Sequence, residues 1–190
     1  MRAQLWAAVK IFLAITLIVG VGYPLVVTGI AQVAFKHGAD GSLVRRNGTV
    51  VGSSLLGQQF KGDQWFQPRP SAAGNGYDAL ASGGSNLGPT NPDLIKTVKQ
   101  RVKAYRAAND LKPSEPVPVD AVTSSGSGLD PHISKLNAHY QARRVSDALG
   151  IPVKKLQQLI DDNTDGPSLG YLGEPGVNVL KLNLALKNAT

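Results

Sequence analysis

The sequence contains no cysteine, and this absence excludes several kinds of chemistry at once. Without thiols the chain forms no disulfide framework and offers no thiolate to a metal or a substrate. Histidine is scarce as well, since the three are His37, His132 and His139, and no two of them are spaced as H-x-x-x-H. We therefore expect no metal site.

Sequence motifs for phosphate binding, and for a hydrolase built on Ser127, are also absent. No G-x-x-x-x-G-K-[ST] segment occurs, so the chain has no P-loop of its own. Ser127, Asp130 and His132 lie close together in SGSGLDPHIS and suggest a hydrolase, but Ser127 does not stand in a G-x-S-x-G spacing. Asp130 before Pro131 is better explained as a helix cap. We assign no catalytic residue.

Charge is absent from one long stretch, Ile11–Phe35, which reads IFLAITLIVGVGYPLVVTGIAQVAF. A helix of this length reaches roughly 37 Å, enough to cross a hydrocarbon core about 30 Å thick. The apolar part of a cleaved signal peptide is shorter, and the glycines and Pro24 would weaken a helix in a soluble core. The composition therefore predicts a transmembrane helix over residues 11–35.

The basic residues on either side of this run indicate its orientation. Arg2 and Lys10 lie in the short amino-terminal segment, and Lys36, Arg45 and Arg46 follow the span. Large domains are translocated largely regardless of charge, so the short tail should decide. We expect residues 1–10 to form a short cytoplasmic tail and residues 36–190 to form a soluble, extracytoplasmic domain.

The span also carries residues suited to contact with another helix. Thr16 and Gly20 form a small-xxx-small pair, which allows close approach of a partner. Tyr23 places a hydroxyl at membrane depth, and Pro24 should kink the helix. Glycine and proline are common in membrane helices, so this pattern is also compatible with a span that meets lipid alone.

The remaining residues predict one mixed α+β domain with long Gly/Pro/Ser-rich loops. Asn47-Gly48 between two β-prone runs is typical of a tight hairpin. A loop extends from about residue 62 to residue 92, and its Trp65, Phe66, Tyr77 and Leu80 indicate that it packs against the domain. Further helices are expected after Asn91-Pro92, between Asp130-Pro131 and Gly150, and after Pro152. Residues 177–186 fit either a strand or a helix.

The helix after Asn91 combines an apolar face with many basic residues. Leu94, Val98, Val102 and Tyr105 recur at helical spacing, and five Lys and Arg residues lie among them. Such a helix could meet acidic lipid or nucleic acid, but a solvated outer face is the simpler interpretation. Because the formal net charge of +7 is scattered over the chain, we expect no nucleic acid partner.

Five segments in order resemble one known family. They are WFQPRPSA (65–72), ASGGSNLGPTNP (81–92), VTSSGSGLDPHIS (122–134), YQARRV (140–145) and VNVLKLNLAL (177–186). Behind a single amino-terminal span, they closely resemble the C subunits of the Kdp high-affinity potassium-transporting P-type ATPases. The resemblance covers nearly the whole chain.

The resemblance implies a non-catalytic subunit in the bacterial plasma (inner) membrane. Its partners would be a channel-like A subunit, an ATP-hydrolysing B subunit, a small F peptide and membrane lipid, and it would meet potassium only indirectly. The phosphorylation motif D-K-T-G-T of P-type ATPases is absent, which agrees with an accessory role. The expected function is to stabilise the assembly and to cap the potassium entrance.

The same resemblance implies an alternative role, that of a catalytic chaperone raising the affinity of the B subunit for ATP. The nucleotide contact proposed for the family falls on Gln141, and Ser82, Gly83 and Gly84 belong to a segment compared with the signature loop of ABC transporters. No covalently bound cofactor is expected. A buried packing residue at Gln141 and a simple turn at 82–84 are the structural alternatives.

Overall fold

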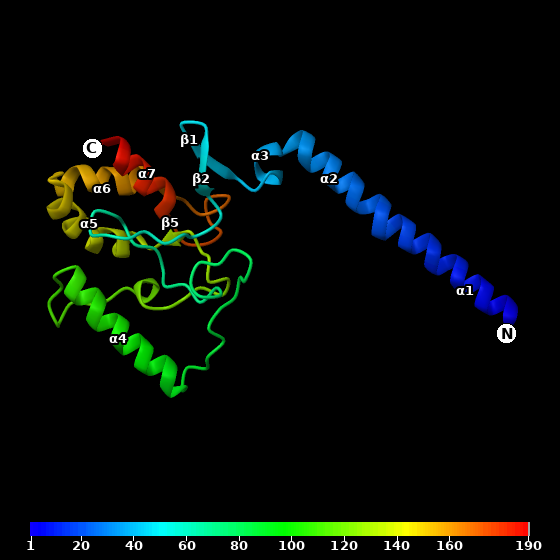
Figure 1. Ribbon diagram of the computed structural model, residues 1–190, viewed down its shortest axis with the longest axis horizontal. Coiled ribbons are helices and arrows are strands. Elements are labelled where there is room, and N and C mark those ends of the chain that lie inside the picture. The colour runs from blue at the N-terminus through cyan, green and yellow to red at the C-terminus, as the bar shows by residue number, and fades with distance from the viewer. Residues whose placement is uncertain (190) are drawn as a thin grey trace. The chain divides into compact units, whose positions relative to one another are not determined.

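The computed structural model describes residues 1–189, and its chain divides into two compact units, Met1–Val51 and a second one from Gly52 onward. Figure 1 shows both units with their elements labelled. The mixture of helices with two small sheets confirms the predicted α+β fold behind one apolar helix.

The first unit contains a long apolar helical segment. It consists of α1 (Arg2–Ile15), a π-helical stretch η1 (Thr16–Gly22) and α2 (Tyr23–Ala34). Its most apolar 18-residue stretch has a mean hydropathy of 2.3, and the whole segment is long and apolar enough to cross a membrane. Helix continues below residue 11, because Arg2 and Lys10 do not interrupt it, and it ends at Ala34, one residue before the predicted limit.

A short helix and a hairpin follow the apolar segment. Helix α3 covers Lys36–Ala39, and the strands β1 (Leu43–Arg46) and β2 (Thr49–Ser53) pair as a two-stranded sheet. Asn47 and Gly48 have φ angles of 50° and 80°, as a type I′ turn requires. The hairpin predicted from Asn47-Gly48 is therefore confirmed.

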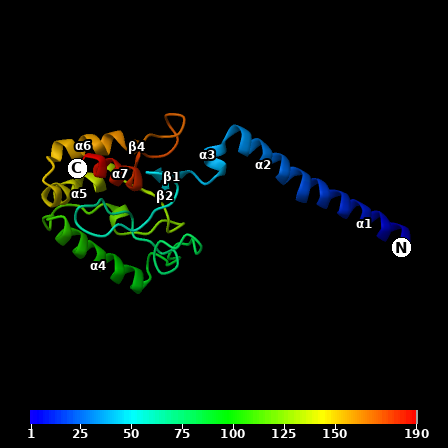
Figure 2. The same ribbon diagram turned by 45° about the horizontal axis from the view of Figure 1, so that its top comes forward.

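The second unit is built on a three-stranded antiparallel sheet with the order β3-β5-β4. Its strands are short: β3 is His132–Ile133, β4 is Thr164–Asp165 and β5 is Gly176–Asn178. Three helices accompany it, α5 (Lys135–Leu149), α6 (Val153–Asp162) and α7 (Val179–Ala189). Figure 2 shows these helices grouped on one side of the unit.

The apolar core lies where these three helices meet the sheet. Its buried side chains come from α5, α6, α7, β3 and β5, with one from the α5–α6 connection (Ile151) and one from the long loop (Phe66). The others are Ile133, Ala138, Ala142, Val145, Leu156, Ile160, Val177, Val179, Leu182 and Leu186. The long loop is thus packed, as expected, but not throughout. Phe66 is completely buried, whereas Leu80 is 98% exposed, so its predicted packing is wrong.

Helix α4 (Pro92–Ala108) lies at the opposite edge of the second unit, and a 3-10 turn, η2 (Val119–Ala121), contacts it. Asn91 caps α4 as predicted, because its Oδ1 accepts hydrogen bonds from the backbone N–H groups of Asp93 (2.8 Å) and Leu94 (3.4 Å). None of its residues is buried. The four residues of the predicted apolar face, Leu94, Val98, Val102 and Tyr105, are nevertheless all half-buried. A hydrogen bond from Arg101 Nη1 to the carbonyl of Val122 (3.1 Å) adds to the attachment.

Two local predictions need correction or completion. Asp130 does not cap the helix that ends at Leu149; Ser134 does, with its Oγ accepting from the N–H of Asn137 at 3.1 Å. The residues between them form β3 instead. Residues 177–186, whose type was open, begin in β5 and continue as α7, so the alternating leucines lie in a helix.

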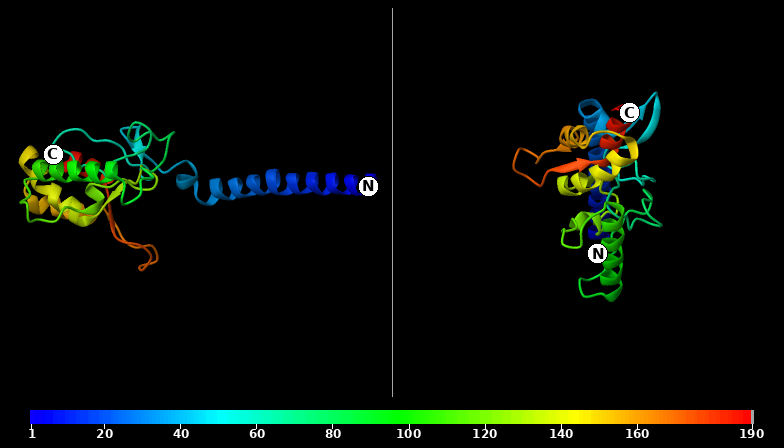
Figure 3. Two further views of the ribbon diagram at one scale, coloured as in Figure 1. Left: turned by 90° about the horizontal axis from the view of Figure 1, so that it is seen from below. Right: turned by 90° about the vertical axis from the view of Figure 1, so that its left-hand side faces the viewer.

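The connection between β4 and β5 forms a protruding arm, seen on its own in Figure 3. Ser168 and Leu172 pair across it through two backbone hydrogen bonds of 2.8 and 2.9 Å. Residues 166–170 match the spacing G-x-S-x-G, so this motif does occur in the chain, away from Ser127. Because this segment is a hairpin tip, and no strand-turn-helix elbow, it does not present Ser168 as a nucleophile.

Candidate functional site

Gln141 lies on the buried face of α5 and is only 1% exposed. Its Oε1 accepts from the backbone N–H of Gln67 (2.6 Å) and from Arg144 Nη2 (2.8 Å). Its Nε2 donates to the carbonyl oxygen of Gln67 (3.1 Å) and to Asn137 Oδ1 (2.8 Å). A side-chain amide offers two donor hydrogens and two acceptor positions, so all four are occupied.

Asn183 in α7 makes the corresponding contact with the neighbouring loop residue. Its Oδ1 accepts from the N–H of Phe66 and its Nδ2 donates to the carbonyl of Phe66, both at 2.9 Å. Successive residues of an extended chain direct their backbone groups to opposite sides. Phe66 is therefore held from α7 and Gln67 from α5. Hereafter we call Gln141 and Asn183 the amide clamp.

Asn183 was not among the site residues predicted from the sequence. An indication was present, because Asn183 interrupts the leucine-rich run of residues 177–186 on the side that also carries Leu182 and Leu186. A buried polar side chain within an apolar helix requires a hydrogen-bonding partner. Its partner belongs to a loop more than a hundred residues earlier in the chain. The sequence near Asn183 therefore does not reveal this contact, which depends on the tertiary fold.

Arg144 lies beside Gln141 and donates only to neutral oxygens. Its partners are Asn109 Oδ1 (3.1 Å), the backbone carbonyls of Asp63 (2.6 Å) and Trp65 (3.1 Å), and Gln141 Oε1. Burial lowers the pKa of its guanidinium. This arrangement ties the start of the long loop to α5 a second time.

A polar hollow of about 210 Å³ adjoins this arginine. Tyr105 reaches it from α4, and its hydroxyl donates to Asn137 Oδ1 at 2.7 Å. Burial is the main cause that raises the pKa of Tyr105 well above its ordinary value. The residues lining the hollow are Gly62, Asp63, Gln67, Tyr105, Ala108, Asn109, Gln141 and Arg144. The site therefore joins α4, α5 and the long loop.

The glycine-rich segment with Ser82, Gly83 and Gly84 packs against a second glycine-rich loop. The hydroxyl of Ser82 and the N–H of Gly83 both donate to the carbonyl of Ser127, at 3.0 and 2.8 Å. A Cβ atom at Gly84 would lie 3.2 Å from the carbonyl oxygen of Gly126. Close packing of two loops thus accounts for Gly84, whereas a Cβ atom at Gly83 would meet open space.

The structure places the two groups of predicted nucleotide residues in different surroundings. Gln141 bonds to the loop around Gln67, whereas Ser82 and Gly83 bond to Ser127. Among the described residues, no hydrogen bond joins one group with the other. A role of either group in nucleotide binding stays a prediction.

Ser127, Asp130 and His132 do not form a nucleophile–base pair. The ring of His132 lies between two carboxylates, with Nε2 3.0 Å from Asp165 Oδ2 and Nδ1 3.6 Å from Asp130 Oδ1. Ser127 Oγ instead accepts from the N–H of Leu129 at 3.1 Å. Arg69 Nη1 completes the group, 2.9 Å from Asp130 Oδ2. These residues form an ion-pair cluster that links the long loop to the sheet.

The electrostatics of this cluster follow from its contacts. The hydrogen bond with Asp130 is the largest cause that raises the pKa of His132, and Asp165 adds to it, while burial opposes both. Burial alone would raise the pKa of Asp130, but hydrogen bonds from His132 and Arg69 hold it below its ordinary value. Protonated His132 is therefore favoured between two ionised carboxylates.

The four residues expected to pack in the membrane lie at or beside the π-helical stretch. Thr16 begins η1 and its hydroxyl donates to the carbonyl of Phe12 at 2.8 Å. Gly20 lies inside η1, and Tyr23 and Pro24 open α2. Proline has no N–H to donate and its ring crowds the preceding turn, which explains a widened turn just before Pro24. No residue of this segment is buried within the described chain.

The fold and the candidate site define a class of protein: one helix able to cross a membrane is followed by an α+β domain, whose buried amides Gln141 and Asn183 bond to the domain's own long loop. The family described as "KdpC: K+-transporting ATPase, c chain" matches residues 5–188, and the chain belongs to this family.

Curated relatives match this chain over nearly their full lengths. A protein of Mycobacterium tuberculosis named "Potassium-transporting ATPase KdpC subunit" is 55% identical over 186 residues, covering 98% of both chains. Relatives with the same name are 52% identical in Rhodospirillum rubrum, covering 98% of this chain and 96% of the relative, and 54% identical over all of both chains in Sorangium cellulosum.

Proposed function

We propose that this chain is the non-catalytic subunit of an ATP-driven, high-affinity potassium uptake complex. It stabilises the assembly with a channel-like A subunit, an ATP-hydrolysing B subunit and a small F subunit, and its domain caps the potassium entrance. The observation that carries the proposal is membership of the c-chain family over residues 5–188. The contacts of His132 and Ser127 support the non-catalytic role. His132 pairs with Asp165, and Ser127 Oγ accepts from the N–H of Leu129, so the two side chains do not form a nucleophile and its base.

Docking of the span on a partner helix is the first part of this proposal. Thr16, Gly20, Tyr23 and Pro24 form the contact, because a glycine lets two backbones approach closely. Gly20→Leu should reduce co-purification of the A and B subunits with this chain. Gly29→Leu is the matched control. It adds the same apolar side chain to the helix, at a position with open space around it. Equal co-purification of both variants would refute docking at Gly20.

The sidedness of the domain is the second part. We place the amino terminus in the cytoplasm of a bacterial plasma membrane and the domain outside it. The chain has no cysteine, so single cysteines report accessibility without background. With Ser114→Cys, a membrane-impermeant thiol reagent should label intact cells; with Gln4→Cys, it should label only opened cells. Labelling in the opposite order would place the domain in the cytoplasm and refute the capping role.

A second candidate function is the nucleotide role of Gln141, together with Ser82, Gly83 and Gly84. It is favoured by Arg144, a half-buried guanidinium that faces neutral oxygens beside the polar hollow. Asn183 provides the matched control, because it holds the same loop without lining that hollow. A direct contact with ATP predicts that Gln141→Ala, but not Asn183→Ala, weakens the apparent ATP affinity of the complex. Equal effects would assign both residues to loop positioning.

A further inference from the structure

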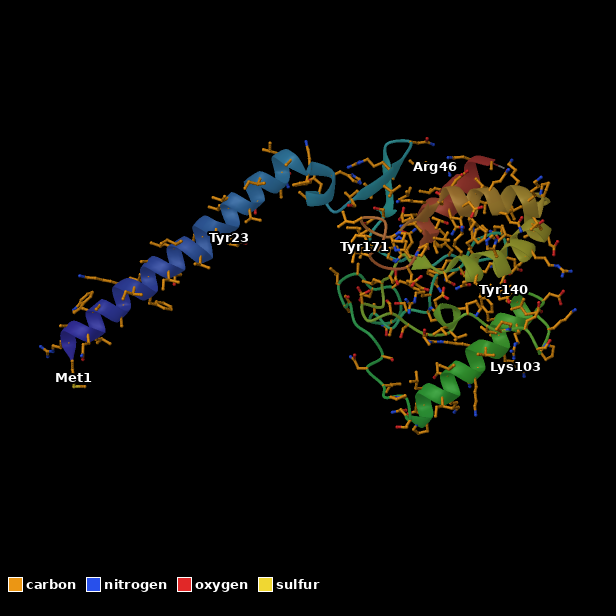
Figure 4. The ribbon with its side chains drawn as sticks, turned by 180° about the vertical axis from the view of Figure 1, so that it is seen from behind. Met1, Tyr23, Arg46, Lys103, Tyr140 and Tyr171 are labelled. Carbon is orange, nitrogen blue, oxygen red and sulfur yellow. The ribbon has the colours of Figure 1, made fainter. Side chains whose placement is uncertain are left out.

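One side of α4 carries a continuous row of basic residues. Lys96, Lys99, Lys103 and Arg106 follow one another at spacings of three, four and three. At about 100° per residue they fall within an arc of about 80°, and the row is about 15 Å long. We call these four residues the basic row. Figure 4 shows Lys103 and α4 at the outer edge of the second unit.

The positive charge of the row is not neutralised within the described part of the chain. The three lysines are exposed, and no ion pair there includes any of the four residues. Arg106 donates from Nη2 to the carbonyl of Glu115 at 3.0 Å, which fixes its position but leaves its charge in place. The one acidic residue of α4 is Asp93, which lies in the first turn and outside the arc that the basic row occupies.

A surface hollow adjoins the row at its carboxyl-terminal end. Its volume is about 450 Å³, and it combines basic and apolar walls: Lys99, Val102, Lys103, Arg106, Leu111 and Pro113. Asp110 also lines it and lies 3.7 Å from Arg143 Nη2. Cationic groups beside apolar carbon match a phosphate attached to a glycerol backbone.

We propose that the basic row and this hollow bind the headgroups of anionic phospholipids. The match is one of charge, since a straight row of cations meets a surface of phosphates. The apolar segment Arg2–Ala34 keeps such a surface within reach of the domain. This inference goes beyond the proposed assembly function and does not depend on it.

Two physical arguments favour lipid over other acidic partners. Lysine is depleted in protein–protein interfaces, and the row consists mainly of lysine. Single-stranded nucleic acid is held by aromatic stacking as well as by charge. The row contains no aromatic residue, and Tyr105 on α4 is engaged with Asn137.

The test places a probe beside the row in the full chain. Gln100, exposed on α4 next to the row, is replaced by cysteine and labelled with an environment-sensitive fluorophore. The protein is reconstituted into phosphatidylcholine vesicles with or without phosphatidylglycerol, with nitroxide groups on the lipid heads as quenchers. Phosphatidylglycerol should increase quenching, and high salt should reverse it. A label at Gln158→Cys on α6 should not respond.

Charge variants decide whether the row causes the response. Lys99→Gln with Lys103→Gln should weaken the dependence on phosphatidylglycerol by about fivefold for each lysine removed. Lys61→Gln with Lys154→Gln removes equal charge from exposed positions elsewhere and should leave it unchanged. No response at Gln100 to phosphatidylglycerol, or an equal loss in both double variants, would overturn the proposal. So would a response to a single-stranded oligonucleotide that phosphatidylglycerol fails to reproduce.

Discussion

Asn183 in α7 binds both backbone groups of Phe66, accepting from its N–H and donating to its carbonyl at 2.9 Å. The aromatic ring of Phe66 is completely buried in the core. The contact therefore fixes a loop residue as firmly as a strand would, although the loop has no partner strand. Gln141 repeats the arrangement one residue later.

Asn183→Asp tests the first half of the amide clamp. Aspartate has nearly the same shape and still accepts from the N–H of Phe66, but its ionised carboxylate cannot donate to the carbonyl. We expect the free energy of unfolding to fall by about 2 kcal/mol at neutral pH. The loss should shrink as acid protonates the new carboxyl group. Urea unfolding followed by Trp65 fluorescence in a Trp6→Phe background measures it; Asn75→Asp, on an exposed loop, should be neutral.

Gln141→Ala tests the second half of the clamp. The substitution leaves the N–H and carbonyl of Gln67 unpaired and removes partners of Arg144 and Asn137. We expect a loss of about 2–4 kcal/mol in the free energy of unfolding, measured by the same urea unfolding. Gln157→Ala on the exposed side of α6 should change it by less than about 0.5 kcal/mol. Equal stability of the two variants would contradict the clamp.

Gly128→Ala tests the packing of the two glycine-rich loops. Gly128 has a φ angle of 67°, and a Cβ there would lie 2.5 Å from the carbonyl oxygen of Gly83. The clash and the left-handed backbone should together lower the free energy of unfolding by about 2 kcal/mol or more. Gly126→Ala, two residues earlier, faces open space and should cost far less. Thermal unfolding of both variants provides the comparison.

The pH dependence of stability should reveal His132. Because its folded-state pKa is raised, mainly by Asp130, its contribution is fully present below pH 6.5 and is lost as the pH rises through the raised value. The melting temperature should therefore fall on the alkaline side of pH 6.5. His132→Gln should flatten that part of the profile, whereas His37→Gln should not.

Asp130 should act in the opposite direction. Its folded-state pKa is lowered, so its contribution is present above its ordinary value of 3.8 and is lost as the pH falls below it. Arg69→Gln removes one of the hydrogen bonds that hold this pKa down. We expect the acid limb of the melting profile of that variant to become shallower. An unchanged acid limb would show that Arg69 does not stabilise the carboxylate.

Local chemistry made part of this fold predictable. Asn47-Gly48 specified its turn and Asn91 its helix cap, because each depends on residues within four positions. Asp130-Pro131 gave a wrong prediction because it, too, was judged from local residues alone. An acidic residue before proline is typical of a helix cap, but here Arg69 and His132 bond to the carboxylate of Asp130. Ser134 caps the helix instead. A contact with a residue 61 positions away has no local pattern.

The sequence indicated which residue to examine in the candidate site, but not the contacts that this residue makes. The resemblance directed attention to Gln141, but its four hydrogen bonds depend on how the long loop folds onto α5. Asn183 was missed because its partner Phe66 is 117 positions away. Alternating leucines in 177–186 suggested a strand as readily as a helix, since side chains along α7 are buried around much of its circumference and periodicity becomes ambiguous.

The π-helical stretch Thr16–Gly22 affects which faces of the apolar helix a partner helix can contact. Hydrogen bonds from i to i+5 insert one extra residue, which turns everything beyond the stretch by about 100° relative to an uninterrupted α-helix. Side chains that would have formed a single stripe along the helix are thereby divided into two, out of phase with each other. A partner helix that packs along one face of α1 therefore no longer meets the continuation of that face on α2. The two halves of the segment can pack against different neighbours.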